Sequence, residues 1–393
     1  MIRQRRDRFN REFEPARYHA FLADVRQRVG VPVDFRLCET PCFFPRDLLT
    51  RLSGAALEMV DALLSDAAYR AAADAAVPPE FRLARGESRP TFVQIDFGLV
   101  NTEAGIEGRL VELQAFPSLY ALQPILAAAY IRQWALDGVE VFLGGLDAGG
   151  YRRLLGNAIV GAHDPEQVVL MEIDPLTQKT LPDFIASERT WGVRTVNVRD
   201  VTREGRRLFY AHEGRRIPIA RVYNRVVPDD ITKRRPQLGF DYRDDLDVEW
   251  TGGPDWFFRI SKFSIPWLRH AWVPETQFLD QLASLPVDRD DWLLKPLFSF
   301  AGGGITFAPT DADIAAIPAD QRHNYILQRR VAFTPVIDTL EGPTQAEIRV
   351  MLVDDAGTYR PVIPLIRMGR GKMMGVDHNK GFGWVGASAA LLE

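Results

Sequence analysis

One stretch of the chain predicts most of its fold, namely Trp292-Leu-Leu-Lys295-Pro-Leu-Phe-Ser299-Phe-Ala-Gly302-Gly303-Gly304-Ile-Thr-Phe307. An apolar run with one lysine leads through three glycines into a second apolar run, which predicts a β-hairpin. Its loop can bind phosphate, because glycine lets backbone N–H groups approach anionic oxygens and Lys295 adds a positive charge. It is not a Walker loop, which continues into a helix after Gly-Lys-Ser/Thr. A plain hairpin turn is the alternative interpretation.

The composition is that of an ordinary globular enzyme. The 393 residues are 46% hydrophobic and 25% charged, enough for two or three lobes. A net charge of −4 gives no global attraction to nucleic acid or to an anionic membrane, and we expect neither as a partner. The basic start of the chain lacks the apolar segment of a signal peptide, so the predicted location is cytoplasmic. Cys38 and Cys42 are too few for a zinc site or a disulfide framework, and we expect buried thiols.

The residue periodicity predicts a mixed α/β (α+β) protein with three regions. Residues 1–135 combine helices, including one over 52–76, with strands over 91–98 and 109–116. Residues 136–245 alternate strands and helices, typical of a small Rossmann-like α/β lobe, although no Gly-x-Gly-x-x-Gly follows a strand there. Its expected strands cover 139–143, 168–173, 193–198 and 217–223. Residues 246–393 contain the lysine and glycine-loop strands.

Two predicted strands of the first region carry a candidate magnesium site. Glu112 and Gln114 lie two residues apart, so their side chains leave the same face of the strand. Asp96, on the neighbouring strand, can reach that face. Carboxylate and amide oxygens are ligands that Mg²⁺ accepts when nucleotide phosphates fill its other positions. The alternative is three polar residues on the wet face of a half-buried hairpin.

Basic residues of the last region are candidates for contact with phosphate. Lys262 lies 33 positions before Lys295, and the two can neutralise neighbouring phosphates of one triphosphate. Arg349 and Arg367, with Asn379 in a glycine-dotted segment, can steady a transferring phosphoryl group. Scattered surface residues are the alternative. The run from Tyr325 to Val331 suits an interlobe hinge beside an adenine, or an ordinary core strand.

These elements together resemble the circularly permuted branch of the ATP-grasp superfamily, which includes glutathionylspermidine synthetase-like proteins. The order carries the resemblance, since Asp96-Phe and Leu-Val-Glu112-Leu-Gln114-Ala-Phe-Pro come before Leu-Lys295-Pro and the glycine loop. Ile-Ser-Lys262-Phe and Tyr-Ile-Leu-Gln328 match two further elements of that branch. The resemblance implies an ATP-grasp architecture with permuted lobe order and an inserted α/β lobe.

The resemblance also implies roles for individual residues. Magnesium would be held by Asp96, Glu112 and Gln114. ATP would be contacted by Lys262, Lys295, Ser299, Gly302, Gly303, Gly304 and Gln328. Catalysis would involve Arg349, Arg367 and Asn379. The chain departs from the pattern at Gln114, where asparagine is usual, and at Gln94, where arginine often precedes the Asp-Phe.

The predicted function is an ATP- and Mg²⁺-dependent carboxylate–amine ligase that works through an acyl-phosphate. Its expected partners are a small-molecule or peptide carboxylate and an amine. Arg225 and Asp229, near a strand end of the α/β lobe, are candidate substrate contacts. Two alternatives stay open: a kinase-like phosphotransferase, and a nucleotide-binding protein without turnover. The sequence specifies neither the substrates nor the oligomeric state.

Overall fold

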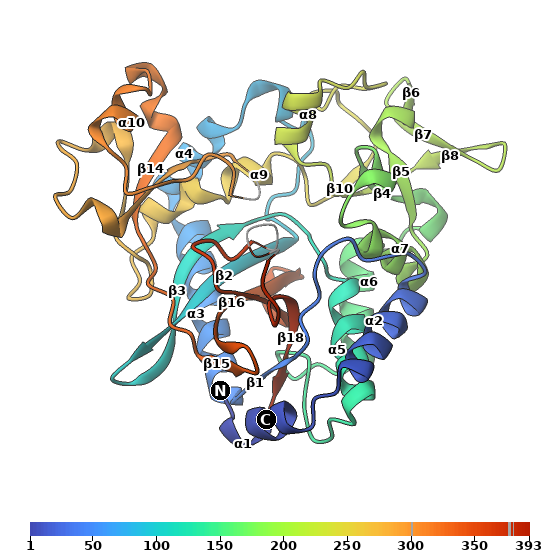
Figure 1. Cartoon of the computed structure of the whole chain (residues 1–393). Helices are drawn as coiled ribbons and strands as arrows, with labels where there is room; N and C mark the ends of the chain where they lie inside the picture. Colours follow the sequence, from blue (N-terminus) through green and yellow to red (C-terminus); the bar gives the residue numbers. More distant parts are fainter. Residues whose placement is uncertain (300–301, 376–378, 380) are drawn as a thin grey trace.

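The fold is built around a central seven-stranded sheet, seen in the computed structural model of Figure 1. Residues 1–299, 302–375, 379 and 381–393 are described. The strand order is β1-β18-β17-β16-β2-β3, with β15 also paired to β16. Their bounds are β1 Cys42–Phe44, β2 Phe92–Thr102, β3 Gly105–Gln114, β15 Ile337–Thr339, β16 Gly342–Asp355, β17 Thr358–Gly369 and β18 Gly386–Leu392. The sheet therefore joins strands from both ends of the sequence.

Strand alternation gives this sheet one apolar face and one partly charged face. On β16, Ile348, Val350 and Leu352 belong to the core cluster under helix α3 (Arg46–Ser65). Glu347 and Arg349 alternate with them and therefore leave the opposite face. Burial of the first face holds the register, because a slip of one residue would exchange the two sets.

Helices pack against both faces of the sheet. The helix expected over 52–76 is in fact two helices, α3 and α4 (Ala67–Ala76). The helix is interrupted at Asp66. The carboxylate of Asp66 accepts hydrogen bonds from the backbone N–H groups of Ala68 and Tyr69 and so caps α4. The remaining helices are α1 Arg3–Arg11, α2 Pro15–Val29, α5 Leu122–Trp134, α6 Ala148–Ile159, α7 Leu181–Trp191, α8 Pro228–Arg234, α9 Trp256–Arg259 and α10 Asp311–Ala315.

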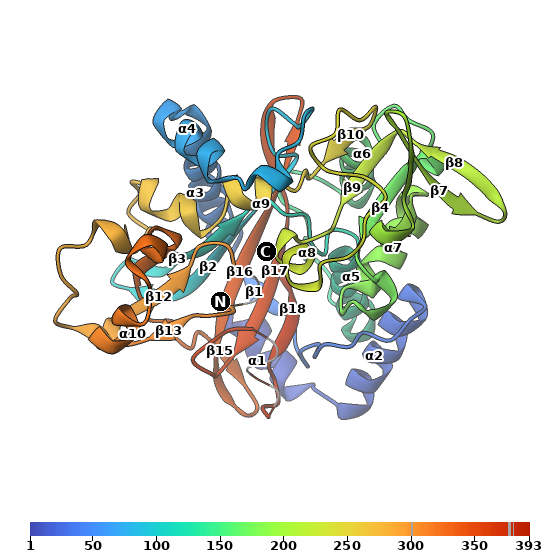
Figure 2. The ribbon, with the colours of Figure 1, turned by 90° about the horizontal axis from the view of Figure 1, so that it is seen from above.

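A small α/β lobe lies on one side of the central sheet (Figure 2). Its four strands are parallel in the order β10-β9-β4-β5, with bounds β4 Val168–Glu172, β5 Arg194–Asn197, β9 Arg221–Asn224 and β10 Glu249–Thr251. An antiparallel sheet of β6 Thr202–Glu204, β7 Arg207–His212 and β8 Arg215–Ile219 is attached to it. The strand expected over 139–143 is not formed, and only Glu140 bridges to Leu392 of β18.

The lobe on the other side carries the lysine and the glycines (Figure 2). Its sheet has the order β11-β14-β12-β13, with bounds β11 Thr276–Phe278, β12 Trp292–Pro296, β13 Thr306–Phe307 and β14 Tyr325–Arg329. Strands β12 and β13 are antiparallel neighbours, so the predicted hairpin is confirmed. Lys262 begins a short 3-10 helix, η5 (Lys262–Trp267). No described helix is long and apolar enough to cross a bilayer.

Candidate active site

A cavity of about 760 Å³ lies where the central sheet meets the lysine lobe and the edge of the α/β lobe. This volume falls in the range of small-molecule sites. The sequence-predicted residues on its wall are Glu112, Gln114, Lys262, Lys295, Ser299, Gly302, Gln328, Arg349 and Arg367. Residues remote from one another in the chain thus share one pocket.

The shared strand face predicted for the acidic residues is confirmed by the register of β2 and β3. Asp96 lies directly opposite Glu112, and Gln94 lies opposite Gln114. Gln114 donates its amide N–H to Gln94 at 2.9 Å, and the Gln94 carbonyl also accepts from Arg349 at 2.9 Å. Gln94 therefore links the carboxylate strand to the arginine strand.

Asp96 itself does not stand free for a metal. Arg349 donates Nε to Oδ1 at 2.5 Å and Nη2 to Oδ2 at 2.6 Å, and Arg367 also pairs with Oδ2. Asp96 is only 1% exposed. Both oxygens are thus used by guanidinium groups, and Asp96 holds the two arginines in place. Its expected role as a magnesium ligand stays a prediction.

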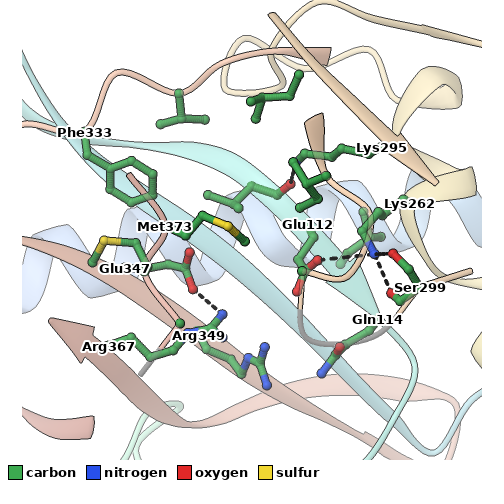
Figure 3. A pocket seen from close by; sticks show the side chains of 18 of the residues that line it. Glu112, Gln114, Lys262, Lys295, Ser299, Phe333, Glu347, Arg349, Arg367 and Met373 are labelled. Carbon is green, nitrogen blue, oxygen red and sulfur yellow. Dashed lines mark hydrogen bonds and ion pairs between the residues drawn. The ribbon is translucent and has the colours of Figure 1, made fainter. Parts of the chain in front are cut away.

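Glu347 takes the position of second carboxylate in the pocket (Figure 3). It is 3% exposed and pairs with Arg367, which lies directly opposite it on β17. Burial raises the pKa of Glu347 to about 7, although Arg367 opposes the shift. Burial also acts to raise the pKa of Glu112, but Lys262 and the two arginines outweigh it and hold the pKa below its ordinary value. The pocket thus presents two carboxylates of different basicity.

Glu347 lies two residues before Arg349 on the same strand, and only the arginine was expected in the site. The signal that could have found Glu347 is the same i, i+2 spacing that identified Glu112 and Gln114. Among the described residues, no group of three His, Cys, Asp or Glu side chains is arranged to hold a metal ion. A metal here would need oxygens from a bound ligand.

The two predicted lysines approach the carboxylates from the opposite wall (Figure 3). Lys262 donates to the backbone oxygen of Ser299 at 2.7 Å and lies 3.8 Å from Oε2 of Glu112. Lys295 donates to Oε1 of Gln328 at 2.5 Å. Burial lowers the pKa of Lys295 to about 8, against the pull of Glu112. Both ammonium groups are in place to meet an anion in the pocket.

Gln328 carries a donor that the protein leaves unused. Its side chain is 1% exposed, its Oε1 accepts from Lys295, and its Nε2 has no hydrogen-bond partner among the described residues. A buried amide N–H without a partner costs on the order of 1–3 kcal/mol. Since Gln328 lines the cavity, a ligand acceptor can remove that cost.

The glycine hairpin meets the segment over 370–375 across the pocket. Gly302 and Gly304 both have φ of +74°, and a Cβ on Gly302 would lie 2.4 Å from Cε of Met373. The positive φ favours glycine at position 302, and any larger residue there would have to displace the end of the Met373 side chain. The expected phosphate loop runs from Ser299 to Gly304, and two of its residues, Phe300 and Ala301, lie outside the described residues. Gly303 is described in the turn but does not line the cavity.

Asn379 holds that segment and does not line the pocket. Its Oδ1 accepts from the backbone N–H groups of Arg370 and Gly371, and its Nδ2 donates to the carbonyls of Met373 and Gly375. The amide group is fully used by these backbone partners, and the expected catalytic role stays a prediction. Its neighbour Lys380 lies outside the described residues.

The two candidate substrate contacts of the α/β lobe lie outside the cavity. Arg225 is 1% exposed and donates Nη1 to Asp183 at 2.6 Å. The same carboxylate accepts backbone N–H groups at the start of α5, so the pair is structural. Asp229 pairs with Lys233 one turn along α8. Both side chains find partners within the protein, and their expected substrate contacts stay predictions.

The sequence matches no known family model, and no curated protein matches it. Among solved structures, a glutathione synthetase-like effector from Globodera pallida, in its apo form, aligns with a TM-score of 0.60 at 12% identity and covers 96% of both chains. At this identity the similarity shows the fold alone. The α+β, ATP-grasp-like fold class predicted from the sequence is thereby confirmed.

Proposed function

We propose that this chain is an ATP- and Mg²⁺-dependent carboxylate–amine ligase with a circularly permuted ATP-grasp arrangement. The observation that carries the proposal is the pairing of Lys262 and Lys295, beside the glycine hairpin, with Glu112 and Glu347 across one cavity. Two lysines that face two carboxylates across one cavity suit a polyphosphate bound together with a divalent ion, because the lysines can contact the phosphates and the carboxylates can contact the ion.

The donor set fits magnesium when phosphates complete it. Glu112 and Glu347 would hold the ion, with Gln114 as a neighbouring amide, and the nucleotide would supply the remaining oxygens. When bound, Mg²⁺ supplies charge neutralisation for the transferring phosphoryl group. Asp96 would act through Arg349 and Arg367, which it orients.

The protein's own groups support two transfer steps. In the first, an oxygen of the substrate carboxylate bonds to the γ-phosphorus while the bond to the leaving ADP oxygen breaks. In the second, the amine nitrogen bonds to the acyl carbon, loses a proton, and phosphate leaves. Lys295 and Lys262 would hold the phosphates, and Arg349 and Arg367 would meet the charge on the transferring group. No covalent protein nucleophile is needed.

A second candidate function is nucleotide binding without turnover. It is favoured by one observation, the occupation of both Asp96 oxygens by arginines. The two functions predict different behaviour of the same site, because a binding protein would retain ATP without releasing ADP.

The deciding experiment measures ADP release with Mg²⁺ across a panel of amino acids, amines and small peptides, with product mass spectrometry. A ligase gives ADP only when a carboxylate and an amine are present together, and the product mass equals the sum of the two minus water. A phosphate ester would instead identify a phosphotransferase. ATP binding without ADP release under every condition would identify the non-catalytic alternative and overturn the ligase proposal.

A further inference from the structure

Three sulfur atoms converge in the core beneath the edge of the central sheet, away from the nucleotide pocket. Sγ of Cys38 and Sγ of Cys42 each lie 3.5 Å from Sδ of Met368. Both cysteines are free and 0% exposed, and Met368 on β17 is 1% exposed. The three side chains come from two remote parts of the chain, so their convergence is a property of the fold.

A buried cation with unused donors lies beside these sulfurs. Arg6 of α1 is 1% exposed; its Nη1 donates to Thr40 at 2.5 Å and to the Pro41 carbonyl at 3.1 Å. Its Nε and Nη2 have no hydrogen-bond partner within the described part of the chain. Its charge interacts with both cysteines, and burial lowers its pKa to about 10. The guanidinium lies 4.7 Å over the Phe9 ring and 5.6 Å over the Phe43 ring, and Asp338 and Asp7 also interact with it. A negative charge among the sulfurs would stabilise this buried cation further.

We propose that Cys38, Cys42 and Met368 form a binding site for one Cu(I) ion. Thiolate and thioether sulfurs are the soft ligands that select Cu(I). On binding, two S–H bonds break, two protons leave to solvent, two metal–thiolate bonds form and the thioether donates a lone pair. No electron is transferred. This inference is independent of the proposed ligase function.

Charge and geometry support a single monovalent ion. Two thiolates and one Cu(I) carry a net charge of −1, which the Arg6 guanidinium neutralises. With metal–sulfur bonds of about 2.3 Å, as in zinc thiolate sites, the sulfurs of a three-coordinate site lie about 4 Å apart. The present separations of 3.5 Å to Met368 are within a small side-chain adjustment of that value.

Burial determines how the site would fill. Burial raises the pKa of both thiols, so they are protonated in the absence of metal. Displacement of these protons makes the apparent affinity rise with pH. Because neither thiol reaches the surface, entry requires local opening near α1 and β1, which lie together close to both chain termini in Figure 1. Slow uptake and slow release follow.

The experiment equilibrates the full-length protein anaerobically with Cu(I) buffered by a chelator, before and after a cycle of unfolding and refolding. We expect one copper ion per chain that resists the chelator, with three sulfur neighbours in X-ray absorption. Cys38→Ala and Cys42→Ala should each abolish stoichiometric binding. Met368→Leu and Arg6→Met should each weaken it by on the order of tenfold, the scale of losing one supporting partner.

The matched control is Met351→Leu, since Met351 is a fully buried methionine of the same sheet that takes no part in the sulfur cluster. It should bind copper as the wild type does. Far-UV circular dichroism checks that each variant folds. Absence of chelator-resistant copper in the wild type would overturn the proposal. So would unchanged binding in folded Cys42→Ala, or a Cys38–Cys42 disulfide found by non-reducing mass spectrometry in place of metal.

Discussion

Lys295 is a cation that the fold keeps away from water. It lies between Gln328 and the backbone of β3, and burial lowers its pKa to about 8. A phosphate at ~4 Å would interact with it by about 4 kcal/mol of gross Coulomb energy at an effective dielectric constant near 20. The cost of burying the ammonium group is therefore offset when an anion binds, which makes Lys295 a determinant of affinity.

Lys295→Met should weaken the binding of a non-hydrolysable ATP analogue with Mg²⁺ by on the order of a hundredfold, the scale of losing one preorganised charge. Isothermal titration calorimetry measures the change. The control is Lys233→Met, which removes an exposed lysine of α8 that pairs with Asp229 in the same helix. An affinity in Lys295→Met equal to that of the control would contradict a phosphate role.

Nucleotide affinity should fall as pH rises through about 8. The pKa of Lys295 is below its ordinary value, so its charged form is lost from the free protein above that pH. Each further pH unit then reduces the charged fraction about tenfold. The same shift makes folding stability rise above pH 8, because the unfolded lysine keeps its proton when the folded one does not.

Binding isotherms at pH 7, 8 and 9 test this pH dependence. Arginine does not titrate in this range, so the Lys295→Arg variant should lose the fall above pH 8. The same slope above pH 8 in both proteins would exclude Lys295 as the titrating group.

The chemistry of the site residues was predictable where it depended on spacing within one strand or hairpin. Glu112 and Gln114 share a face because they are two residues apart, and Asp96 opposes Glu112 in the adjacent strand. The pairing of Asp96 with Arg349 could not be predicted, because 253 positions separate them in the sequence. For the same reason the pairing of Arg225 with Asp183, 42 positions away, could not be predicted.

The glycine hairpin and the segment over 370–375 form two opposed elements of the pocket wall. The hairpin is held by β12 and β13, whereas the opposite segment is held by Asn379. A Cβ on Gly302 would lie 2.4 Å from Cε of Met373, so the two segments are close there. A change at this point would alter the shape of the proposed phosphate site without removing any charge.

Gly302→Ala should weaken nucleotide binding by roughly tenfold, since a non-glycine residue in the left-handed region costs roughly 1–2 kcal/mol. The methyl group would also displace Met373. The matched control is Gly357→Ala, at φ +91° in a turn where a Cβ meets nothing within 4 Å. Equal affinity losses in the two variants would show that the hairpin position is not special.

The buried ion pair between Arg225 and Asp183 supports the start of α5 and should contribute to the stability of the fold. Arg225→Met removes the buried partner of Asp183 and should lower the free energy of unfolding by about 3–5 kcal/mol. Asp229→Ala, which breaks an exposed pair within α8, should cost less than about 1 kcal/mol. Urea unfolding of both variants measures the difference. A small loss of unfolding free energy in Arg225→Met would show that the pair is not structural and would favour Arg225 as a binding group.

Elements with a local signal were predicted well from the sequence. The hairpin around the glycines, the β2 and β3 pair and strands β4 and β5 follow from apolar periodicity and turn residues. The strand expected over 217–223 is divided between β8 and β9, and β10 was not predicted. The break between α3 and α4 was missed because alanine-rich periodicity continues through Asp66, where one capping residue decides the outcome. The run over 139–143 is apolar because it packs against the core. It pairs with a strand through the single bridge between Glu140 and Leu392 and does not itself form a strand.

At the scale of the whole molecule, the pocket exists only because distant parts of the chain meet. Strands β2 and β3 pair beside β16, more than two hundred residues later, and the lysine lobe and the α/β lobe flank that sheet (Figure 2). Such pairing leaves no local trace in the sequence, so the site could be assembled from the sequence only through the family resemblance. The cavity wall is accordingly built from residues of the central sheet, the lysine lobe and the edge of the α/β lobe.

Hydrogen exchange should therefore resolve the pocket into two ends. An ATP analogue with Mg²⁺ should protect amides of β12, the glycine hairpin, β14 and the segment over 370–375, because these line the nucleotide end. The amides near Ser118 and Thr180, where the α/β lobe meets the cavity, should gain protection only when a carboxylate substrate is added. The hairpin gains most, since glycine-rich backbone without ligand has little packing to hold it. Equal exchange of the hairpin with and without nucleotide would show that the three glycines serve only as a turn. Protection of both ends of the pocket by nucleotide alone would mean that the nucleotide spans the whole cavity.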